Sequence, residues 1–255
     1  MKKNKPKKNP VKKQKVIVVM PAYNAGKTLK KTYDAIDKKI VKDIILVDDG
    51  SKDNTVILAE KLKIKVFQHP KNLGYGGNQK TCYWEALQMG ADIVVMIHPD
   101  YQYDATLIEE MVRPIMQGRY GYMFGSRIRT RKEALDGGMP THKYIFNRFY
   151  TLIANPILGV NFSEHMSGMR AYSRKTLETV PFQRFSNDFM FDQQFTVASI
   201  VKDIKIGEIP IPVRFYEESS SISLWPGLRF GLGSLWVLTL YILNKANLYT
   251  APIFR

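Results

Sequence analysis

Short, continuous apolar runs alternate with helical patterns through the first half of this 255-residue chain. A run that is apolar at every position is typical of a strand buried on both faces, as in a parallel sheet. Strands that alternate with helices favour right-handed βαβ units, so we expect an α/β fold with a mostly parallel central sheet flanked by helices. The expected strands cover residues 16–20, 44–47, 65–68, 93–97 and 120–125.

The second half of the chain has a less regular pattern. Residues 205–215 are expected to be extended, and Pro210 and Pro212 place them at a sheet edge because proline donates no hydrogen bond to a neighbouring strand. The other elements expected here are a mobile polar loop over 130–139, a helix over 144–153 that ends before Pro156, a strand over 169–172 and a helix over 189–201.

The C-terminal part is dominated by an almost wholly apolar run over residues 230–243. Its 14 residues fall short of the roughly 20 that an upright helix needs to cross a bilayer. We therefore expect a helix that lies in the membrane interface, or a hairpin packed against the core. The chain divides into a basic disordered tail (1–15), one α/β domain (16–220) and this apolar segment (221–255).

The charge of the chain is strongly positive, with a net value of +15. Residues 1–15 contain eight lysines and no acidic residue, which favours attraction to an anionic surface. No aromatic stacking platform or zinc-finger spacing accompanies these lysines, so we expect a membrane surface and no nucleic-acid partner. The single cysteine, Cys82, excludes an internal disulfide and favours a reducing compartment. A cytoplasmic protein, peripheral on the cytoplasmic face of the membrane, fits both observations.

The candidate chemistry begins where the apolar run 93–97 ends. His98, Asp100 and Gln102 follow at alternate positions, and alternate residues of an extended chain point to the same side. Carboxylate and carboxamide oxygens suit Mg²⁺ or Mn²⁺, while an imidazole leans towards Mn²⁺. These residues therefore predict a divalent-cation site at the carboxyl end of a strand. The alternative is a polar loop in which Asp100 only caps the next helix.

Polar residues also follow the other expected strands, among them Asn24, Asp48 and Asp49. Carboxyl ends of strands form the ligand crevice of open α/β sheets, so a nucleotide site is expected there. The chain has no Walker A motif, and the glycines at 74–77 lack dinucleotide spacing. A cation at Asp100 is then the simplest way to hold a diphosphate. Asp48 or Asp49 could accept a hydrogen bond from a base or ribose, or could form an ordinary Asx turn.

Three motifs resemble the nucleotide-sugar half of family 2 glycosyltransferases, and within that family the dolichol-phosphate mannose synthase branch. They are Val-Met-Pro-Ala-Tyr-Asn at 19–24, Leu-Val-Asp-Asp-Gly-Ser at 46–51, and Asn-Leu-Gly-Tyr-Gly-Gly-Asn at 72–78. The resemblance covers about residues 16–216. It implies a Rossmann-like GT-A fold, a nucleoside-diphosphate sugar as donor, inversion at the anomeric carbon, and a lipid-linked or glycan acceptor.

The resemblance also implies roles for particular residues. The family's metal motif falls on 98–102, so His98, Asp100 and Gln102 would hold the cation, with Asp100 central to catalysis. The acidic position that serves as base in many relatives matches Asp188, and Asp192 lies one helical turn further on. The remaining positions assigned to substrate binding are Pro21, Tyr23, Asn24, Asp48, Asp49, Gly77, Asn78, Arg127, Ser167 and Arg170.

This chain departs from the family pattern in three places. His98 stands where relatives carry a metal-binding carboxylate, and Glu164 stands where they carry an aspartate. The arginine, glycine and Ser-Lys group that follows the last strand of polyprenyl-phosphate enzymes is replaced by Tyr-Glu-Glu-Ser-Ser-Ser-Ile at 216–222. The His98 substitution leaves a second hypothesis open, namely a non-catalytic protein that binds nucleotide sugars or acts as a scaffold.

Overall fold

The computed structural model describes residues 14–212, 215 and 224–255. Nearly all of the predicted basic tail lies outside the described residues, and so do the two acidic residues at 217–218 and the proposed boundary at residue 220.

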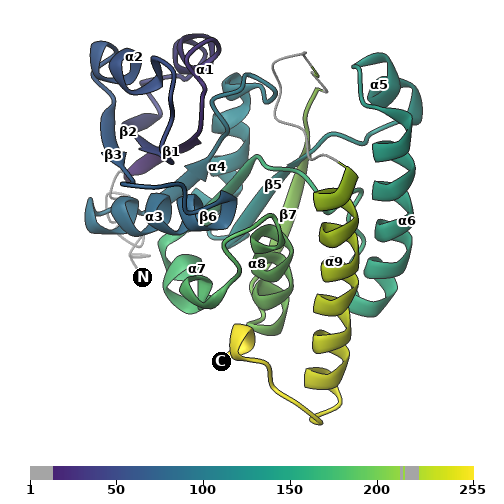
Figure 1. Cartoon of the computed structure of the whole chain (residues 1–255). Helices are drawn as coiled ribbons and strands as arrows, with labels where there is room; N and C mark the ends of the chain where they lie inside the picture. Colours follow the sequence, from purple (N-terminus) through teal and green to yellow (C-terminus); the bar gives the residue numbers. More distant parts are fainter. Residues whose placement is uncertain (1–13, 213–214, 216–223) are drawn as a thin grey trace, which may run out of the picture.

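One twisted sheet forms the centre of the molecule (Figure 1), and within the described residues it has seven strands in the order β3-β2-β1-β4-β6-β5-β7. Only β6 runs antiparallel to its neighbours, β4 and β5, so the predicted mostly parallel sheet is confirmed. The strands are β1 (Val16–Ala22), β2 (Val41–Asp48), β3 (Lys65–Gln68), β4 (Ile93–Met96), β5 (Tyr122–Ser126), β6 (Arg170–Ser173) and β7 (Ile206–Pro210).

Helices cover both faces of the sheet, which explains why the strands are apolar at every position. In β1, Ile17 and Val19 join the core on one face, whereas Val16, Val18 and Met20 join the core on the other. The α-helices are α1 (Leu29–Asp34), α2 (Thr55–Lys61), α3 (Tyr75–Gln88), α4 (Ile108–Met116), α5 (Arg131–Asp136), α6 (Thr141–Leu158), α7 (Arg174–Thr179), α8 (Met190–Val201) and α9 (Leu224–Lys245), and the 3₁₀-helices are η1 (Ala105–Leu107), η2 (Phe182–Arg184) and η3 (Pro252–Phe254).

Two predictions for the second half of the chain are wrong. The expected loop over 130–139 contains α5, which begins at Arg131. Thr130 caps this helix, because the threonine hydroxyl accepts a hydrogen bond from the Glu133 N–H. Helix α6 continues through Pro156 and ends at Gly159, whose φ is +69°. Proline removes only one hydrogen bond in the last turn, and buried Leu158 beyond it still packs in the core.

The C-terminal segment is a helix, α9, which packs against α8 and α6 (Figure 1). Val237, Leu238 and Tyr241 are buried, so one side of α9 belongs to the core. The hairpin alternative is therefore wrong. None of the helices in the described ranges is long and apolar enough to cross a membrane.

Candidate functional site

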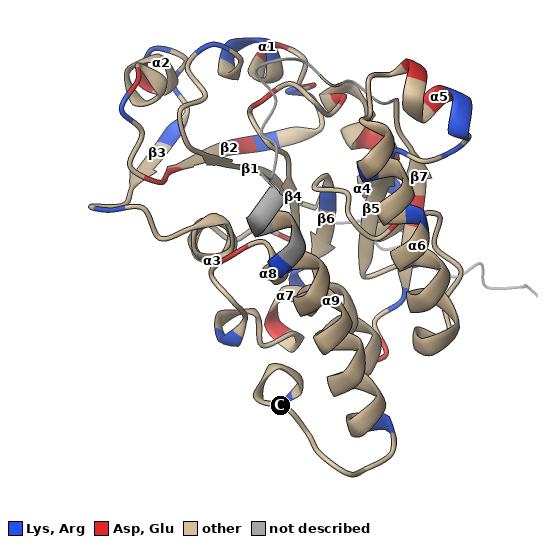
Figure 2. Ribbon diagram, turned by 45° about the vertical axis from the view of Figure 1, so that its right-hand side comes forward, with Lys and Arg blue, Asp and Glu red and all other residues tan. Residues whose placement is uncertain are grey.

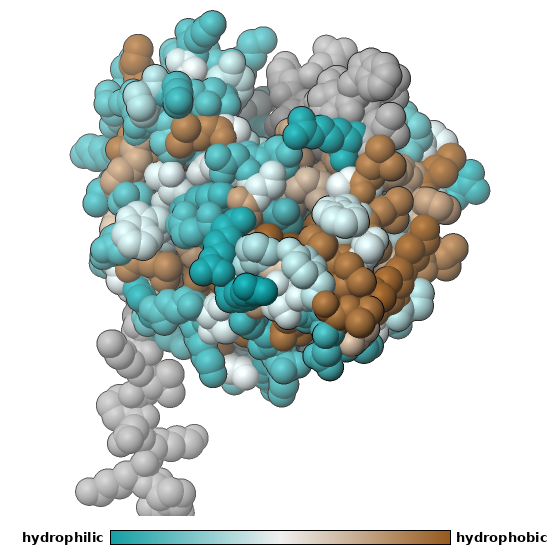
Figure 3. All heavy atoms as spheres, turned by 60° about the horizontal axis from the view of Figure 1, so that its bottom comes forward, coloured by the Kyte–Doolittle hydropathy of each residue, from teal (hydrophilic) through white to brown (hydrophobic). Residues whose placement is uncertain are grey.

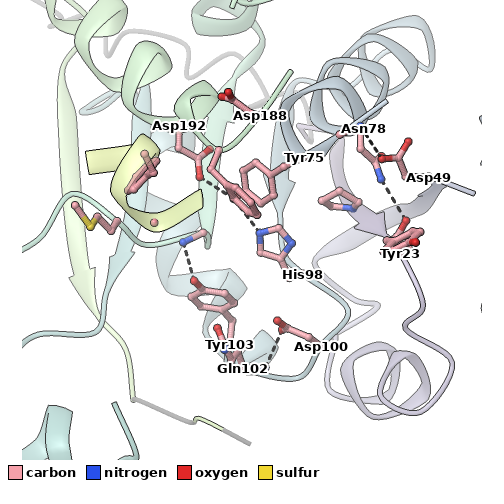
Figure 4. A pocket seen from close by; sticks show the side chains of 18 of the residues that line it. Tyr23, Asp49, Tyr75, Asn78, His98, Asp100, Gln102, Tyr103, Asp188 and Asp192 are labelled. Atoms are coloured by element: carbon pink, nitrogen blue, oxygen red, sulfur yellow. Dashed lines mark hydrogen bonds between the residues drawn. The ribbon is translucent and has the colours of Figure 1, made fainter. Parts of the chain in front are cut away.

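A cavity of about 1440 Å³ opens at the carboxyl ends of β1 and β4. In Figure 4, Tyr23, Asp49 and Asn78 lie on one side, Asp188 and Asp192 on the other, and His98 between them. Strand ends that are far apart in the sequence therefore meet at one place, as predicted. The predicted site residues that line the cavity are Pro21, Tyr23, Asn24, Asp49, Asn78, His98, Asp100, Gln102, Arg127 and Asp188.

Four other predicted residues do not line this cavity: Asp48, Gly77, Ser167 and Arg170. Asp48 is buried and its Oδ2 accepts N–H groups from Gly50 and Ser51 at 3.2 and 3.0 Å, which is the Asx-turn alternative. Its Oδ1 has no hydrogen-bond partner among the described residues. Gly77 lies in α3, where a Cβ would approach the Leu73 Cβ to 2.9 Å, so its place in the motif is explained by close packing.

The side of the cavity near β1 and β2 is held together by two buried polar residues. Asp49 accepts N–H groups from Leu73 and Gly74 at 2.8 and 3.0 Å, and its Oδ1 lies 2.7 Å from His69 Nδ1. Asn78 donates to the Val47 carbonyl at 3.0 Å. These bonds fix the glycine-rich loop against the ends of the strands. The exposed ring of Tyr23 is left at the cavity edge, where a flat ring can stack.

Tyr75 connects His98 with Asp192, and the sequence prediction did not include it. Its hydroxyl donates to Asp192 Oδ2 at 2.7 Å and lies 3.2 Å from His98 Nε2 (Figure 4). Because the single hydroxyl hydrogen goes to the carboxylate, His98 Nε2 carries a hydrogen and Nδ1 keeps its lone pair. Burial also lowers the pKa of His98, so the imidazole is neutral near pH 7. A neutral imidazole is the form that binds a metal ion.

Asp100 and Gln102 lie on the same loop below His98. Asp100 Oδ1 accepts the Gln102 N–H at 3.1 Å, and both side chains are largely buried in the cavity wall. The Gln102 Nε2 has no hydrogen-bond partner in the described part of the chain. That part also contains no group of three or more His, Cys, Asp or Glu residues that could hold a metal alone. One carboxylate with two neutral donors fits a cation that also takes oxygens from a bound diphosphate.

Arg127 and Glu164 form a buried ion pair beneath another wall of the cavity. Arg127 Nη2 lies 2.8 Å from Glu164 Oε2, and Asn147 donates to the same oxygen at 2.9 Å. Burial alone would raise the pKa of Glu164, but the charge and hydrogen bonds of Arg127 bring this pKa below its ordinary value. Arg127 is thus anchored by Glu164, with its side chain still lining the cavity.

Arg170 lies below the cavity and supports Asp192. It is almost fully buried, it donates to Thr196 Oγ1 at 3.0 Å, and its Nε lies 3.7 Å from Asp192 Oδ1. It also donates to the Ser167 carbonyl at 2.9 Å. The Ser-Gly-x-Arg stretch at 167–170 therefore forms the floor of the site. Its arginine does not line the cavity but holds Asp192, which does.

The two candidate bases differ in their surroundings. Asp188 Oδ1 accepts from the Ser186 hydroxyl at 2.7 Å and from the Met190 N–H at 2.9 Å, at the start of α8. Asp192 accepts from Tyr75 and, at 3.3 Å, from Gln79. Both carboxylates line the cavity, and Asp192 is the one of the two with a buried arginine beside it.

Comparison with known proteins agrees with this geometry. Residues 17–180 match the profile of Glycosyl transferase family 2. The chain is 28% identical over 221 residues to the UDP-N-acetylglucosamine–dolichyl-phosphate N-acetylglucosaminyltransferase of Methanococcus voltae, an alignment that covers 80% of this chain and 87% of that protein. It is 23% identical over 245 residues to the undecaprenyl-phosphate mannosyltransferase of Micrococcus luteus, covering 87% of this chain and 96% of that protein.

Solved structures support the fold in the same way. The glucosyl-3-phosphoglycerate synthase of Mycobacterium tuberculosis, in complex with Mn²⁺, uridine diphosphate and glucosyl-3-phosphoglycerate, aligns with a TM-score of 0.67 at 20% identity. The alignment covers 93% of this chain and 82% of that chain. The GT-A fold predicted from the motifs is thus confirmed. Because the family profile matches well over half of its residues, the chain belongs to glycosyltransferase family 2.

Proposed function

We propose that this glycosyltransferase moves a sugar from a nucleoside-diphosphate sugar to a phosphate carried by a polyprenyl lipid, with inversion at the anomeric carbon. The observation that supports this most is the presence of cationic side chains in the cavity wall. Lys143 of α6 and Arg229 of α9 line the same cavity as Tyr23 and Asp49 of the nucleotide motifs. Guanidinium and ammonium groups suit an anionic acceptor.

The donor diphosphate would lie beside the loop 98–102. Asp100, with Gln102 and His98, would hold a divalent cation, either Mg²⁺ or Mn²⁺, and the Mn²⁺ in the similar mycobacterial synthase supports this. The cation would neutralise charge on the departing diphosphate. The protein's own contribution is a fixed carboxylate and a neutral imidazole oriented by Tyr75.

Two relatives have names that identify polyprenyl phosphates as acceptors, and this supports the lipid-linked acceptor. A phosphate monoester has a second pKa near 6, so it is largely ionised at pH 7 and attacks without a strong base. A glycan hydroxyl is the other acceptor class considered. It would need a base, and we propose Asp188, which lines the cavity, for that role.

A transfer assay tests the proposal directly. The full-length protein would be incubated with Mn²⁺ or Mg²⁺, a panel of uridine, guanosine and thymidine diphosphate sugars, and a polyprenyl phosphate, and products would be detected by mass spectrometry. We expect a lipid-linked sugar with one of the donors. The competing hypothesis, a non-catalytic binding protein, rests on His98 in the metal motif. Calorimetric binding of a donor with neither transfer nor hydrolysis would support that hypothesis and reject ours.

The proposed role of Asp188 as a base can be separated from its hydrogen bond with the first residue of α8. In Asp188→Asn the Oδ1 that accepts from Met190 is retained while the negative charge is lost. We expect transfer to a polyprenyl phosphate to change less than about threefold, and transfer to any hydroxyl acceptor to fall about 10²–10⁴-fold. Initial rates with both acceptors measure this. Full activity of the variant on a hydroxyl acceptor would show that Asp188 is not the base.

A further inference from the structure

The outward sides of α6 and α9 form one continuous apolar surface. On α6 the exposed side chains Ile145, Phe149 and Leu152 recur at helical spacing. The two helices touch, since a Cβ on Gly231 would lie 2.8 Å from the Phe146 ring. Figure 3 shows brown side chains gathered on this part of the molecule. We call this surface the α6/α9 face, made of Ile145, Phe149, Leu152, Leu232, Leu235, Trp236 and Ile242.

The charged side chains of α6 and α9 themselves have one sign. Neither α6 nor the chain from residue 224 to 255 contains an aspartate or glutamate, so Figure 2 shows blue but no red along these helices. The cations of the two helices are Lys143, Arg148, Arg229 and Lys245. A second copy of the chain docked on the same face would bring these cations together. Anionic lipid headgroups would instead complement them, while the apolar side chains enter the acyl region.

The same two helices form a wall of the catalytic cavity. Lys143 and Phe146 of α6 line it, and so do Arg229 and Phe230 of α9. The helix pair therefore carries the apolar face and also contributes Lys143 and Arg229 to the cavity wall. A molecule with an anionic head and a long apolar tail could place its head in the cavity without removing its tail from a bilayer.

We propose that the α6/α9 face lies on an anionic lipid bilayer, in the plane of the interface, and presents the cavity to an acceptor phosphate carried by a membrane lipid. Trp236 would lie at headgroup depth, where tryptophan is enriched. The inference rests on the proposed function for the identity of the acceptor, but the docking itself can be measured without any transfer.

Vesicle co-sedimentation of the full chain tests the docking. We expect binding to vesicles of phosphatidylcholine with phosphatidylglycerol to be at least tenfold tighter than binding to phosphatidylcholine alone. The double variant Phe149→Gln with Trp236→Gln should bind the anionic vesicles at least tenfold more weakly. The matched control is Ile57→Gln with Trp84→Gln, because these side chains are 56% and 52% exposed, close to the 56% and 59% of Phe149 and Trp236, but lie on α2 and α3. The control should bind as the unaltered chain does.

Several outcomes would overturn the inference. If the two double variants bind vesicles equally well, the α6/α9 face does not bind the membrane. The lysine-rich residues 1–15 or another surface would then be responsible for vesicle binding. The chain could instead fail to bind vesicles and form a concentration-dependent dimer in light scattering. If the Phe149 and Trp236 changes abolish that dimer, the face is a contact between two copies of the chain. Failure of the proposed function can be distinguished from failure of the docking proposal. If the chain binds vesicles through this face but transfers no sugar, even to a short water-soluble polyprenyl phosphate, the proposed function fails and the docking proposal stands.

Discussion

Replacing Asp100 by asparagine is expected to reduce the rate of sugar transfer by at least about a hundredfold, since one fixed charge at a developing leaving group is typically worth 10²–10³ in rate. Asparagine keeps the Oδ1 that accepts the Gln102 N–H at 3.1 Å, so the loop should retain its shape. What is lost is the negative charge that would hold the cation. Steady-state transfer with saturating donor measures the effect, and the thermal unfolding midpoint should change little.

The control for this change is Asp104→Asn on the same loop. Asp104 accepts the Thr106 N–H at 3.1 Å at the start of η1 and does not line the cavity. Its asparagine variant should keep transfer within about twofold. A second readout is the binding of Mn²⁺ in the presence of uridine diphosphate, followed by electron paramagnetic resonance. If Asp100→Asn binds Mn²⁺ and transfers sugar as well as the unaltered protein, the cation is held elsewhere.

Glu164→Gln is expected to lower the free energy of unfolding by about 3–5 kcal/mol, the usual cost of breaking a buried ion pair from one side. Glutamine keeps the size of the side chain but leaves the Arg127 guanidinium buried without its counter-charge. The carboxylate also accepts from Asn147, so α6 loses an anchor as well. Urea unfolding of both proteins at pH 7 gives the difference directly.

An exposed pair provides the comparison for Glu164. Arg129 Nε lies 2.8 Å from Glu133 Oε2, with both side chains close to half exposed. Glu133→Gln should therefore lower the free energy of unfolding by no more than about 0.5 kcal/mol. The pH dependence gives a further check, because the pKa of Glu164 is lowered in the folded protein. The ionised Glu164 carboxylate therefore stabilises the folded protein at pH values above its ordinary pKa of 4.5, and this stabilisation is lost as pH falls through the pKa of the folded state. The free energies of unfolding of the unaltered protein and of Glu164→Gln should converge in acid. A constant difference down to low pH would contradict the ion-pair explanation.

The positions of the site residues follow from patterns that are local in the sequence. Each apolar run predicts a buried strand, and the polar residues after it then share one edge of the sheet. For this reason the parallel direction of the strands and the polarity of the residues after them are enough to predict that Asp49, His98 and Asp100 lie together. The same logic could not separate Asp48 from Asp49, because which of two adjacent acids faces the cavity depends on the turn that follows.

Contacts between distant segments could not be predicted in this way. Tyr75 lies in a predicted motif, yet its bonds to His98 and Asp192 depend on how α3 and α8 pack over the sheet. The family resemblance assigned Arg170 to substrate binding, but its partners include Thr196 and Asp192, 26 and 22 residues further on. Periodicity indicates that a residue is buried or exposed, and it does not identify which residue it contacts.

The reversed strand β6 has a consequence for how such enzymes can be altered. Because β6 runs against β4, its first residue, Arg170, pairs with Met96 at the carboxyl end of β4, so the stretch that precedes Arg170 lies at the end of the sheet where the cavity opens. The proposed nucleotide side of the cavity is encoded before residue 103, whereas the proposed acceptor side draws on residues 127–170 and on α9. Exchanging residues 127–170 and α9 together between homologues is therefore expected to transplant acceptor preference into a chain whose nucleotide preference stays its own.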